Sequence, residues 1–217
     1  EATRHTLAFA SVATVLTAAA GLVVAYAARI DRGRAAAGMV RLASLGYAVP
    51  GTVLAIGLLP VVGGIENIAG GGLLLLGTGL AVIYAYVARF LAVSAGGIEA
   101  GFERLPPSLD DAARTLGAPA ARRLWQVHLP LVRPAIATAA MLVFVDGVKE
   151  LPATLLLRPL GVETLATHLY GEAVRGTYED AAIAALAIVA AGLVPVLILA
   201  RISRRRGAHV PDTPGWL

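Results

Sequence analysis

Three charged side chains follow an apolar stretch in the second half of the chain, and they are the residues best placed to do chemistry. Asp146, Lys149 and Glu150 come directly after the charge-free window 134–145. Helical spacing of three and four residues puts them on one face. An ionised group at hydrocarbon depth costs about 3 kcal/mol, so it must face a partner or a cavity. Two interpretations stay open: a self-neutralising cluster that holds the helix end, or groups lining a path for an ion, for which carboxylate oxygens suit a hard cation.

Other reactive groups are sparse. The chain contains no cysteine, and its four histidines are scattered without metal-ligand spacing: His5, His128, His168 and His209. No Gly-Lys-Ser/Thr loop that could cradle a phosphate occurs, and no nucleophile–base pair stands out. We therefore predict no enzymatic activity, no cofactor and no metal site, and we expect any energy for transport to come from a partner.

Composition places these residues in a membrane. Hydrophobic residues make up 58% of the 217 and charged residues 15%, whereas soluble domains contain about 25% charged residues. A membrane-spanning helix needs about 20 apolar residues. The sequence predicts an all-α polytopic membrane bundle over residues 1–203 and a disordered basic tail over 204–217. Its five predicted spans are the windows 5–28, 42–65, 67–88, 134–145 and 181–200.

The positive charges predict an orientation. If the first span ends on the cytoplasmic side, fourteen of the eighteen Lys and Arg residues lie in cytoplasmic segments. The chain start is then external and the chain end cytoplasmic. A net charge of +4 is too small to indicate nucleic acid as a partner. Pro50 falls inside the second window, where the carbonyl it frees fits either a pore-lining kink or ordinary packing.

The cytoplasmic loop 97–133 has the pattern of two short helices joined at a glycine. Ser108 is predicted to cap the first helix, with Asp111 reaching back as in a capping box. Gly117 suits a left-handed C-cap, and the second helix is expected to stop before Pro130. Such a rigid, amphipathic element fits a groove on another protein or rests on lipid; spacing alone leaves both open.

The same loop resembles the EAA loop of ABC importer permeases with the MetI-like fold. Asp111-Ala112-Ala113, three residues, Gly117, nine residues, and then Val127-His128-Leu129-Pro130 agree with that pattern at each fixed point. Asp111 replaces Glu and Val127 replaces Ile. The resemblance implies that this loop is the coupling helix that docks on an ATP-hydrolysing subunit. The residues expected to couple are Asp111, Ala112, Ala113, Gly117, Leu129 and Pro130.

Two further stretches resemble ferric-iron permeases. Residues 47–55 look like a core helix of ABC permeases, and 149–159 are similar to a stretch typical of the iron permeases, a likeness that 161–170 continues. The resemblance implies a bacterial inner-membrane protein that is the second half of a fused pair. Its expected partners are an ATP-binding subunit in two copies, a homologous permease half or second permease subunit, a periplasmic solute-binding protein and the lipid bilayer.

These expectations leave two rival functions. The same architecture could import thiamine, a phosphonate or another small solute instead of iron. A secondary transporter or channel would need no ATPase, but it would leave the helix–glycine–helix loop unexplained. In each case Pro50, Asp146, Lys149 and Glu150 are the residues predicted to line the path. The stretch 163–175, too short and polar to cross, is predicted to form an interfacial or partly re-entrant external helix.

Overall fold

The computed structural model describes residues 1–30, 33–68, 70, 75–201 and the backbone of 202–207. Within those residues every regular element is helical, which confirms the all-α prediction. Five of the helical segments are long and apolar enough to cross a bilayer, by length and composition. Those segments are Ala2–Ile30, Gly51–Ile68, Leu80–Glu103, Ala120–Val148 and Tyr178–Ile198.

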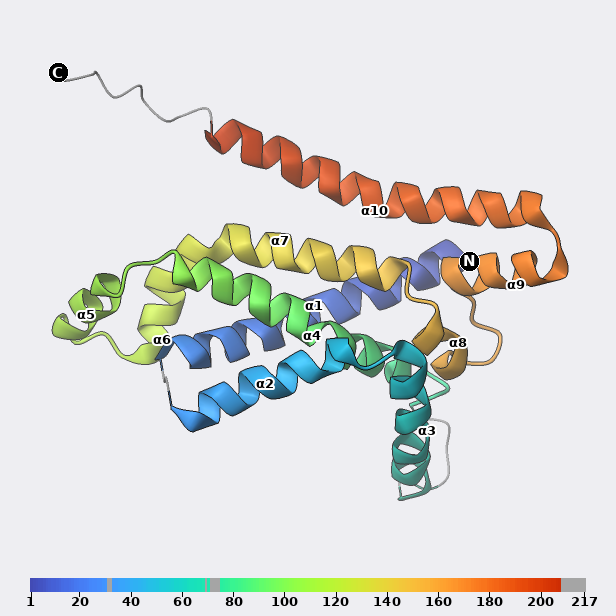
Figure 1. Ribbon diagram of the computed structural model, residues 1–217, viewed down its shortest axis with the longest axis horizontal. Helices are drawn as coiled ribbons and strands as arrows, with labels where there is room; N and C mark the ends of the chain where they lie inside the picture. The colour runs from blue at the N-terminus through green and yellow to red at the C-terminus, as the bar shows by residue number, and fades with distance from the viewer. Residues whose placement is uncertain (31–32, 69, 71–74, 208–217) are drawn as a thin grey trace.

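Three long helices make the centre of the bundle. Helices α1 (Ala2–Ile30), α4 (Leu80–Glu103) and α7 (Leu129–Val148) lie side by side along the long axis (Figure 1). Alanine and other small residues fill much of their interface, as is usual where helices associate in lipid. One buried cluster surrounds Tyr86 and Phe90, and a second surrounds Phe102 and Tyr26, near the C-terminal ends of α4 and α1.

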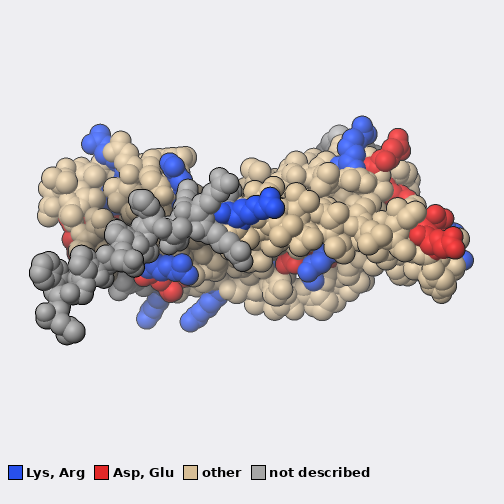
Figure 2. All heavy atoms as spheres, turned by 90° about the horizontal axis from the view of Figure 1, so that it is seen from above, with Lys and Arg blue, Asp and Glu red and all other residues tan. Residues whose placement is uncertain are grey.

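The remaining helices cover this centre incompletely. Helix α2 (Arg34–Ala48) packs along α4, and α10 (Tyr178–Gly207) runs back over α7 from α9 (Figure 1). The chain start lies at the α9 end, while α10 runs toward the opposite end, where α5 lies (Figure 1). The face shown in Figure 2 is mostly uncharged, and its charged side chains lie in a few places where blue and red spheres are often adjacent. That surface fits an apolar surrounding.

The second predicted span, 42–65, is divided between two helices. The chain breaks at Pro50, between α2 and α3 (Gly51–Ile68), and α3 runs across the long axis of the other helices (Figure 1). Proline lacks an amide hydrogen and disfavours the helical region for the residue before it; accordingly Val49 is extended, with φ −80° and ψ 127°. Pro50 therefore lies at a corner, and the proline inside the apolar helix is Pro60.

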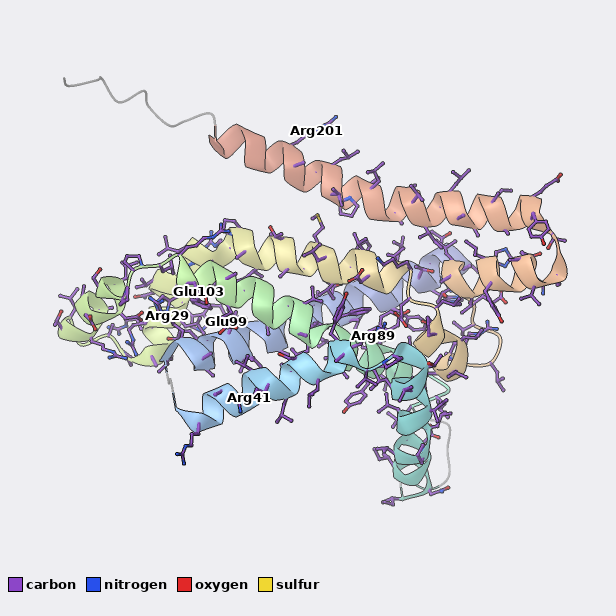
Figure 3. The ribbon with its side chains drawn as sticks, in the orientation of Figure 1. Arg29, Arg41, Arg89, Glu99, Glu103 and Arg201 are labelled. Carbon is purple, nitrogen blue, oxygen red and sulfur yellow. The ribbon has the colours of Figure 1, made fainter. Side chains whose placement is uncertain are left out.

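The third predicted span is displaced. Residues 77–79, expected inside it, form the turn before α4, which begins at Leu80 and continues to Glu103. Arg89, expected at the cytoplasmic end of the span, lies within the helix (Figure 3). The prediction failed because it searched for charge-free windows, whereas an arginine is tolerated in an apolar helix when it is paired. Thirteen positive charges then remain in the segments predicted to be cytoplasmic.

The helix predicted to stop before Pro130 does not stop. Helix α6 (Ala120–Arg123), a π-helical turn η1 (Leu124–His128) and α7 form one continuous run. The Leu129 amide donates to the Leu124 carbonyl, five residues back. Pro130 cannot donate, and its ring would clash with the carbonyl four residues before it in a regular α-helix. The wider π turn accommodates that ring.

Two short helices lie between α7 and α10. Helix α8 (Pro152–Leu157) follows a break at 149–151, and α9 (Leu165–Arg175) begins at Thr164 in a complete capping box with Thr167. A short helix was predicted over 163–175, and α9 matches it. At the other end of α10, residues 204–207 are helical although they were assigned to the disordered tail; residues 208–217 lie outside the described part.

Candidate coupling loop and intramembrane polar groups

The glycine hinge of the loop has the predicted geometry. Helix α5 (Ser108–Thr115) is followed by Gly117, whose φ of +73° lies in the left-handed region. The Gly117 amide donates to the Arg114 carbonyl, and the Ala118 amide to the Ala113 carbonyl, 3.0 Å away. These two bonds form a Schellman motif, which fixes the direction in which the chain leaves α5.

The start of α5 differs from the prediction. Pro107 occupies the N-cap position, and no side chain makes a capping hydrogen bond there, so Ser108 and Asp111 do not form the predicted capping box. Asp110 and Asp111 do lie in the first helical turn, where the helix dipole favours negative charge.

Asp110, which is not among the residues predicted to couple, anchors α5 to the bundle. Its Oδ2 accepts from Arg29 Nε at 3.0 Å and lies 2.9 Å from Arg29 Nη2. Its Oδ1 lies 3.1 Å from His128 Nε2 and 3.8 Å from Arg123 Nη1. The carboxylate therefore joins the end of α1, the loop and the π turn. Arg29 is 12% exposed and Asp110 15%, so this pair is largely shielded from solvent.

Arg29 also binds the segment that leads from α4 into the loop. Its guanidinium donates to the Phe102 and Leu105 carbonyls, both at 3.1 Å, which are carbonyls near the end of α4. Beside it, His128 is 1% exposed and meets the rings of Tyr26 and Phe102 edge-on. The Tyr26 hydroxyl donates to the Ala120 carbonyl at 2.6 Å. The loop is thus fixed to α1 on both sides of Gly117.

The opposite face of the loop is exposed. Asp111, Ala112 and Gly117 are exposed, Leu116 is 85% exposed and Trp125 is 66% exposed. Ala113 is buried, Leu129 is half-buried and Pro130 is exposed. The six residues predicted to couple therefore divide between a face that packs on the bundle and a face that is available to another surface.

The cluster predicted from Asp146, Lys149 and Glu150 does not form as one group. Lys149 Nζ lies 2.8 Å from Asp146 Oδ1, but Lys149 is 61% exposed. Helix α7 ends at Val148, so helical spacing no longer applies to Glu150, which points elsewhere. Glu150 is 7% exposed and lies 3.3 Å from Arg89 Nε.

Arg89 connects this carboxylate to the corner at Pro50. It lies about 14 Å into α4, nine residues from its start at 1.5 Å per residue. Its Nη1 donates to the Val49 carbonyl at 3.1 Å. Figure 3 places Arg89 where α2, α3 and α4 meet. The structure thus brings Glu150 and the corner at Pro50 to one arginine and leaves the exposed Lys149 paired with the half-buried Asp146.

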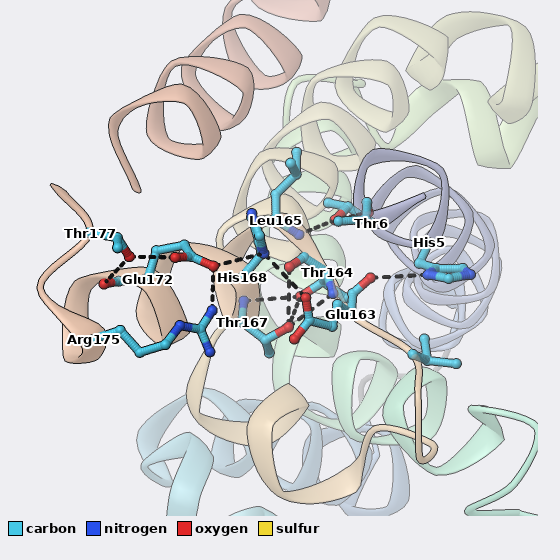
Figure 4. Close-up of polar contacts among 12 residues, drawn as sticks. His5, Thr6, Glu163, Thr164, Leu165, Thr167, His168, Glu172, Arg175 and Thr177 are labelled. Carbon is cyan, nitrogen blue, oxygen red and sulfur yellow. Dashed lines mark hydrogen bonds and ion pairs between the residues drawn. The ribbon is translucent and has the colours of Figure 1, made fainter. Parts of the chain in front are cut away.

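A third polar group lies at the α9 end (Figure 4). Glu163 Oε2 lies 3.2 Å from His168 Nδ1, and Glu172 contacts both Arg175 and the Thr177 hydroxyl. Hydrogen bonds from Thr177 and Arg175 hold the pKa of Glu172 below its usual range. Within the described residues no three His, Asp or Glu side chains are placed to hold a metal ion.

An all-helical bundle with apolar spans and a glycine-hinged loop, anchored on one face and exposed on the other, has the form of a membrane permease domain. Residues 10–208 match the family described as "Binding-protein-dependent transport system inner membrane component", and the chain belongs to this family of ABC importer permeases.

The relatives that match this chain are named for the transport of different solutes. The chain is 26% identical over 174 residues to "Ferric transport system permease protein FbpB" of Actinobacillus pleuropneumoniae, covering 80% of the chain and 24% of that protein. It is 30% identical over 131 residues to "Putative 2-aminoethylphosphonate transport system permease protein PhnV" of Salmonella typhimurium, covering 60% of the chain and 49% of the relative. The chain spans between a quarter and a half of these curated relatives.

Solved structures share the fold. A bacterial alginate ABC transporter in complex with a periplasmic protein matches with a TM-score of 0.76 at 17% identity, over 94% of this chain and 77% of that chain. The inward-facing MetNI methionine ABC transporter matches with a TM-score of 0.75 at 20% identity, over 94% of both chains. These likenesses confirm the MetI-like fold.

Proposed function

We propose that this chain forms part of a solute path across the bacterial inner membrane and couples that path to ATP hydrolysis in a separate subunit. The observation that carries the proposal is the division of the loop into two faces. Asp110 and His128 fix one face to α1 and α7, while Leu116 and Trp125 project from the other. A partner subunit that binds the exposed face of the loop and moves would therefore displace α1 and α7 together.

The partners follow from the same layout. Two ATP-binding subunits are the expected occupants of the exposed loop faces, one on each permease half. A homologous half is the expected partner of α3, which leaves the bundle with apolar residues exposed on it, among them Val53 at 56% and Ile56 at 60%. A periplasmic solute-binding protein would meet the α9 end. This arrangement keeps the chain start external and the loop and chain end cytoplasmic, in line with the positive charges.

Ferric iron is the proposed cargo. The relative named for ferric transport aligns over 80% of the chain, and the sequence 149–159 resembles the iron permeases. Asp146, Lys149, Glu150 and Pro50 stay the proposed path residues, and carboxylates suit a hard cation. The second candidate is 2-aminoethylphosphonate, favoured by the 30% identity to a permease with that name.

Reconstituted transport tests these proposals. The complete permease would be purified with its ATPase and binding protein, placed in liposomes, and supplied with ATP inside. We expect uptake of ⁵⁵Fe(III) that stops without ATP. Uptake of 2-aminoethylphosphonate instead would transfer the assignment to the second candidate. Uptake that needs no ATPase would favour a secondary transporter or channel and contradict the proposal.

A further inference from the structure

Two helix breaks meet at Arg89. The first is the corner between α2 and α3 at Pro50, and the second is the break between α7 and α8 at 149–151. Arg89 of α4 contacts the Val49 carbonyl at the first break and the Glu150 carboxylate at the second. One side chain therefore joins two places where the backbone leaves its helical hydrogen-bond pattern.

Arg89 and Glu150 form a bridge between the two breaks, and each side chain satisfies one backbone group at a break. Arg89 Nη1 donates to the Val49 carbonyl at 3.1 Å, and the Ala153 amide donates to Glu150 Oε1 at 3.2 Å. Helix ends leave such groups without helical partners, and hydrocarbon offers none. The two side chains therefore stabilise the breaks as well as each other.

The contact between the Arg89 and Glu150 side chains is the weakest interaction in the bridge. Arg89 Nε lies 3.3 Å from Glu150 Oε2, but its hydrogen is not directed at a hydrogen-bond acceptor. Charge attraction alone therefore joins the two halves of the bridge. Unpaired charges at this depth are costly, so separation requires that water or another charged group enter between them.

Gly51 provides the space that the bridge occupies. A Cβ at this position would lie 2.8 Å from Glu150 Oε1 and 3.0 Å from Arg89 Nη1. Both distances are shorter than ordinary van der Waals contact, and both atoms are at the ends of long side chains. A methyl group at Gly51 would thus push the two charged groups out of place without removing either.

The α8 side of the bridge is held to α4 independently. Tyr86, one turn before Arg89 on α4, contacts the Thr154 hydroxyl at 2.6 Å, and that hydroxyl donates to the Glu150 carbonyl at 2.8 Å. Tyr86 is 2% exposed and Thr154 is fully buried. If the ion pair separates, α8 keeps this attachment to α4. The Arg89 side chain, still bonded to the Val49 carbonyl, is then free to move with the α2–α3 corner away from Glu150.

We propose that the Arg89–Glu150 bridge is an intramembrane latch that holds the α2–α3 corner against α8 in one state of the transport cycle and opens in another. Arg89 and Glu150 are positioning residues in this proposal, and α3 is the element that they position. The latch rests on the proposed function, because its opening is driven by ATP-dependent movement of the loop.

The absence of cysteine from the chain gives a direct test. Thr52, exposed in the first turn of α3, would be replaced by Cys in the complete transporter with its ATPase, in nanodiscs. Labelling of the permease by a membrane-impermeant maleimide would be compared without nucleotide and with ATP plus vanadate. We expect the rates to differ by about fivefold or more, the lower range of typical coupling between sites.

Two variants separate a latch from a passive ion pair. Glu150→Gln keeps the acceptor for the Ala153 amide but removes the charge, and Gly51→Ala keeps both charges but displaces them. Each should reduce the nucleotide-dependent difference to less than about twofold, well below the coupling expected of the intact latch. Gly57→Ala, in the same helix with nothing within 4 Å of an added Cβ, should retain the full difference.

The outcomes distinguish the latch from the proposed function. Failure of an ATPase subunit to co-purify with the permease would contradict the proposed function before any labelling. A functional complex in which Thr52→Cys labels equally in both nucleotide states would overturn the latch alone. So would Glu150→Gln and Gly51→Ala proteins that keep the difference seen in the Gly57→Ala control.

Discussion

Asp110 and Asp111 are adjacent aspartates with different roles in the structure. Asp110 is held by Arg29 and lies beside His128, while the neighbouring Asp111 is exposed. The motif comparison selected Asp111 because it occupies the fixed acidic position of the EAA pattern. Nothing in that pattern marks Asp110, and Arg29 at the end of an apolar window is equally explained as a cytoplasmic flanking charge.

This contrast gives a prediction with a built-in control. Asp110→Asn should destabilise the protein by about 3 kcal/mol, because it leaves the shielded Arg29 guanidinium without its counter-charge. Asp111→Asn should leave the melting temperature unchanged and weaken binding of the ATPase subunit. Thermal melting in detergent and co-purification measure the two effects. Equal melting of the two variants would contradict the anchoring role of Asp110.

Glu150 shows why the path residues were harder to predict than the loop residues. Helical spacing places it beside Asp146, but the spacing argument holds only as far as Val148, where α7 ends. Its partner Arg89 is 61 positions earlier in the sequence. A pair formed by a helix residue and a residue of a distant helix break leaves no local spacing for a sequence argument to detect.

At the scale of elements, Gly117 was predictable because one residue type fits the required backbone angle. Its φ of +73° costs a residue with a Cβ about 1–2 kcal/mol. Gly117→Val should therefore reorient the chain after α5 and uncouple ATP hydrolysis from uptake, while membrane insertion stays intact.

Liposome assays of ATP hydrolysis and ⁵⁵Fe(III) uptake would measure the Gly117→Val effect. Gly96→Val is the matched control, since Gly96 lies in α4 with nothing within 4 Å of an added Cβ. Normal cargo-stimulated uptake by the Gly117→Val protein would show that the hinge does not transmit force.

The π turn and the corner at Pro50 are the elements that the sequence did not predict. Pro130 was interpreted as a helix stop, and Pro50 as either a pore-lining kink or ordinary packing. The helix instead continues through Pro130, and α2 ends just before Pro50. The difference depends on packing. His128 and Tyr26 hold the η1 turn, and at the corner Arg89 donates a hydrogen bond to the free Val49 carbonyl.

The segment that connects α9 to α10 should become less ordered at acidic pH. The Thr177 and Arg175 contacts lower the pKa of Glu172, so the ionised form is favoured in the folded protein. That contribution is fully present above the usual glutamate pKa of about 4.3 and is lost as the pH falls through the lowered value. Hydrogen exchange at residues 176–178 should quicken over this acidic range.

Glu172→Gln provides the reference for this titration. Its exchange at 176–178 should already be fast at pH 7, and it should change less with acidification than exchange in the unaltered protein, after correction for intrinsic rates. Identical pH profiles for the two proteins would assign the order of this connection to backbone capping rather than to the carboxylate.

For the whole molecule, composition and the positions of apolar windows were sufficient to predict an all-helical membrane bundle. The loop motif was sufficient to predict its family, to which residues 10–208 belong. The boundaries of the second and third spans were not predictable, because Arg89 lies inside a helix and the direction of α3 depends on contacts with α4 and α8. Apolar windows alone specify neither the boundaries of these spans nor the direction of α3.

The proposed function requires that the exposed face of the loop contact a separate ATPase subunit. A photo-crosslinking amino acid at Leu116, which is 85% exposed beside Gly117, tests it in intact membranes that contain the complete transporter. Leu160 is the matched control, since it is 96% exposed in the segment between α8 and α9. We expect a crosslink to the ATPase from position 116 and none from position 160. Crosslinks from position 116 to phospholipid alone would contradict the account.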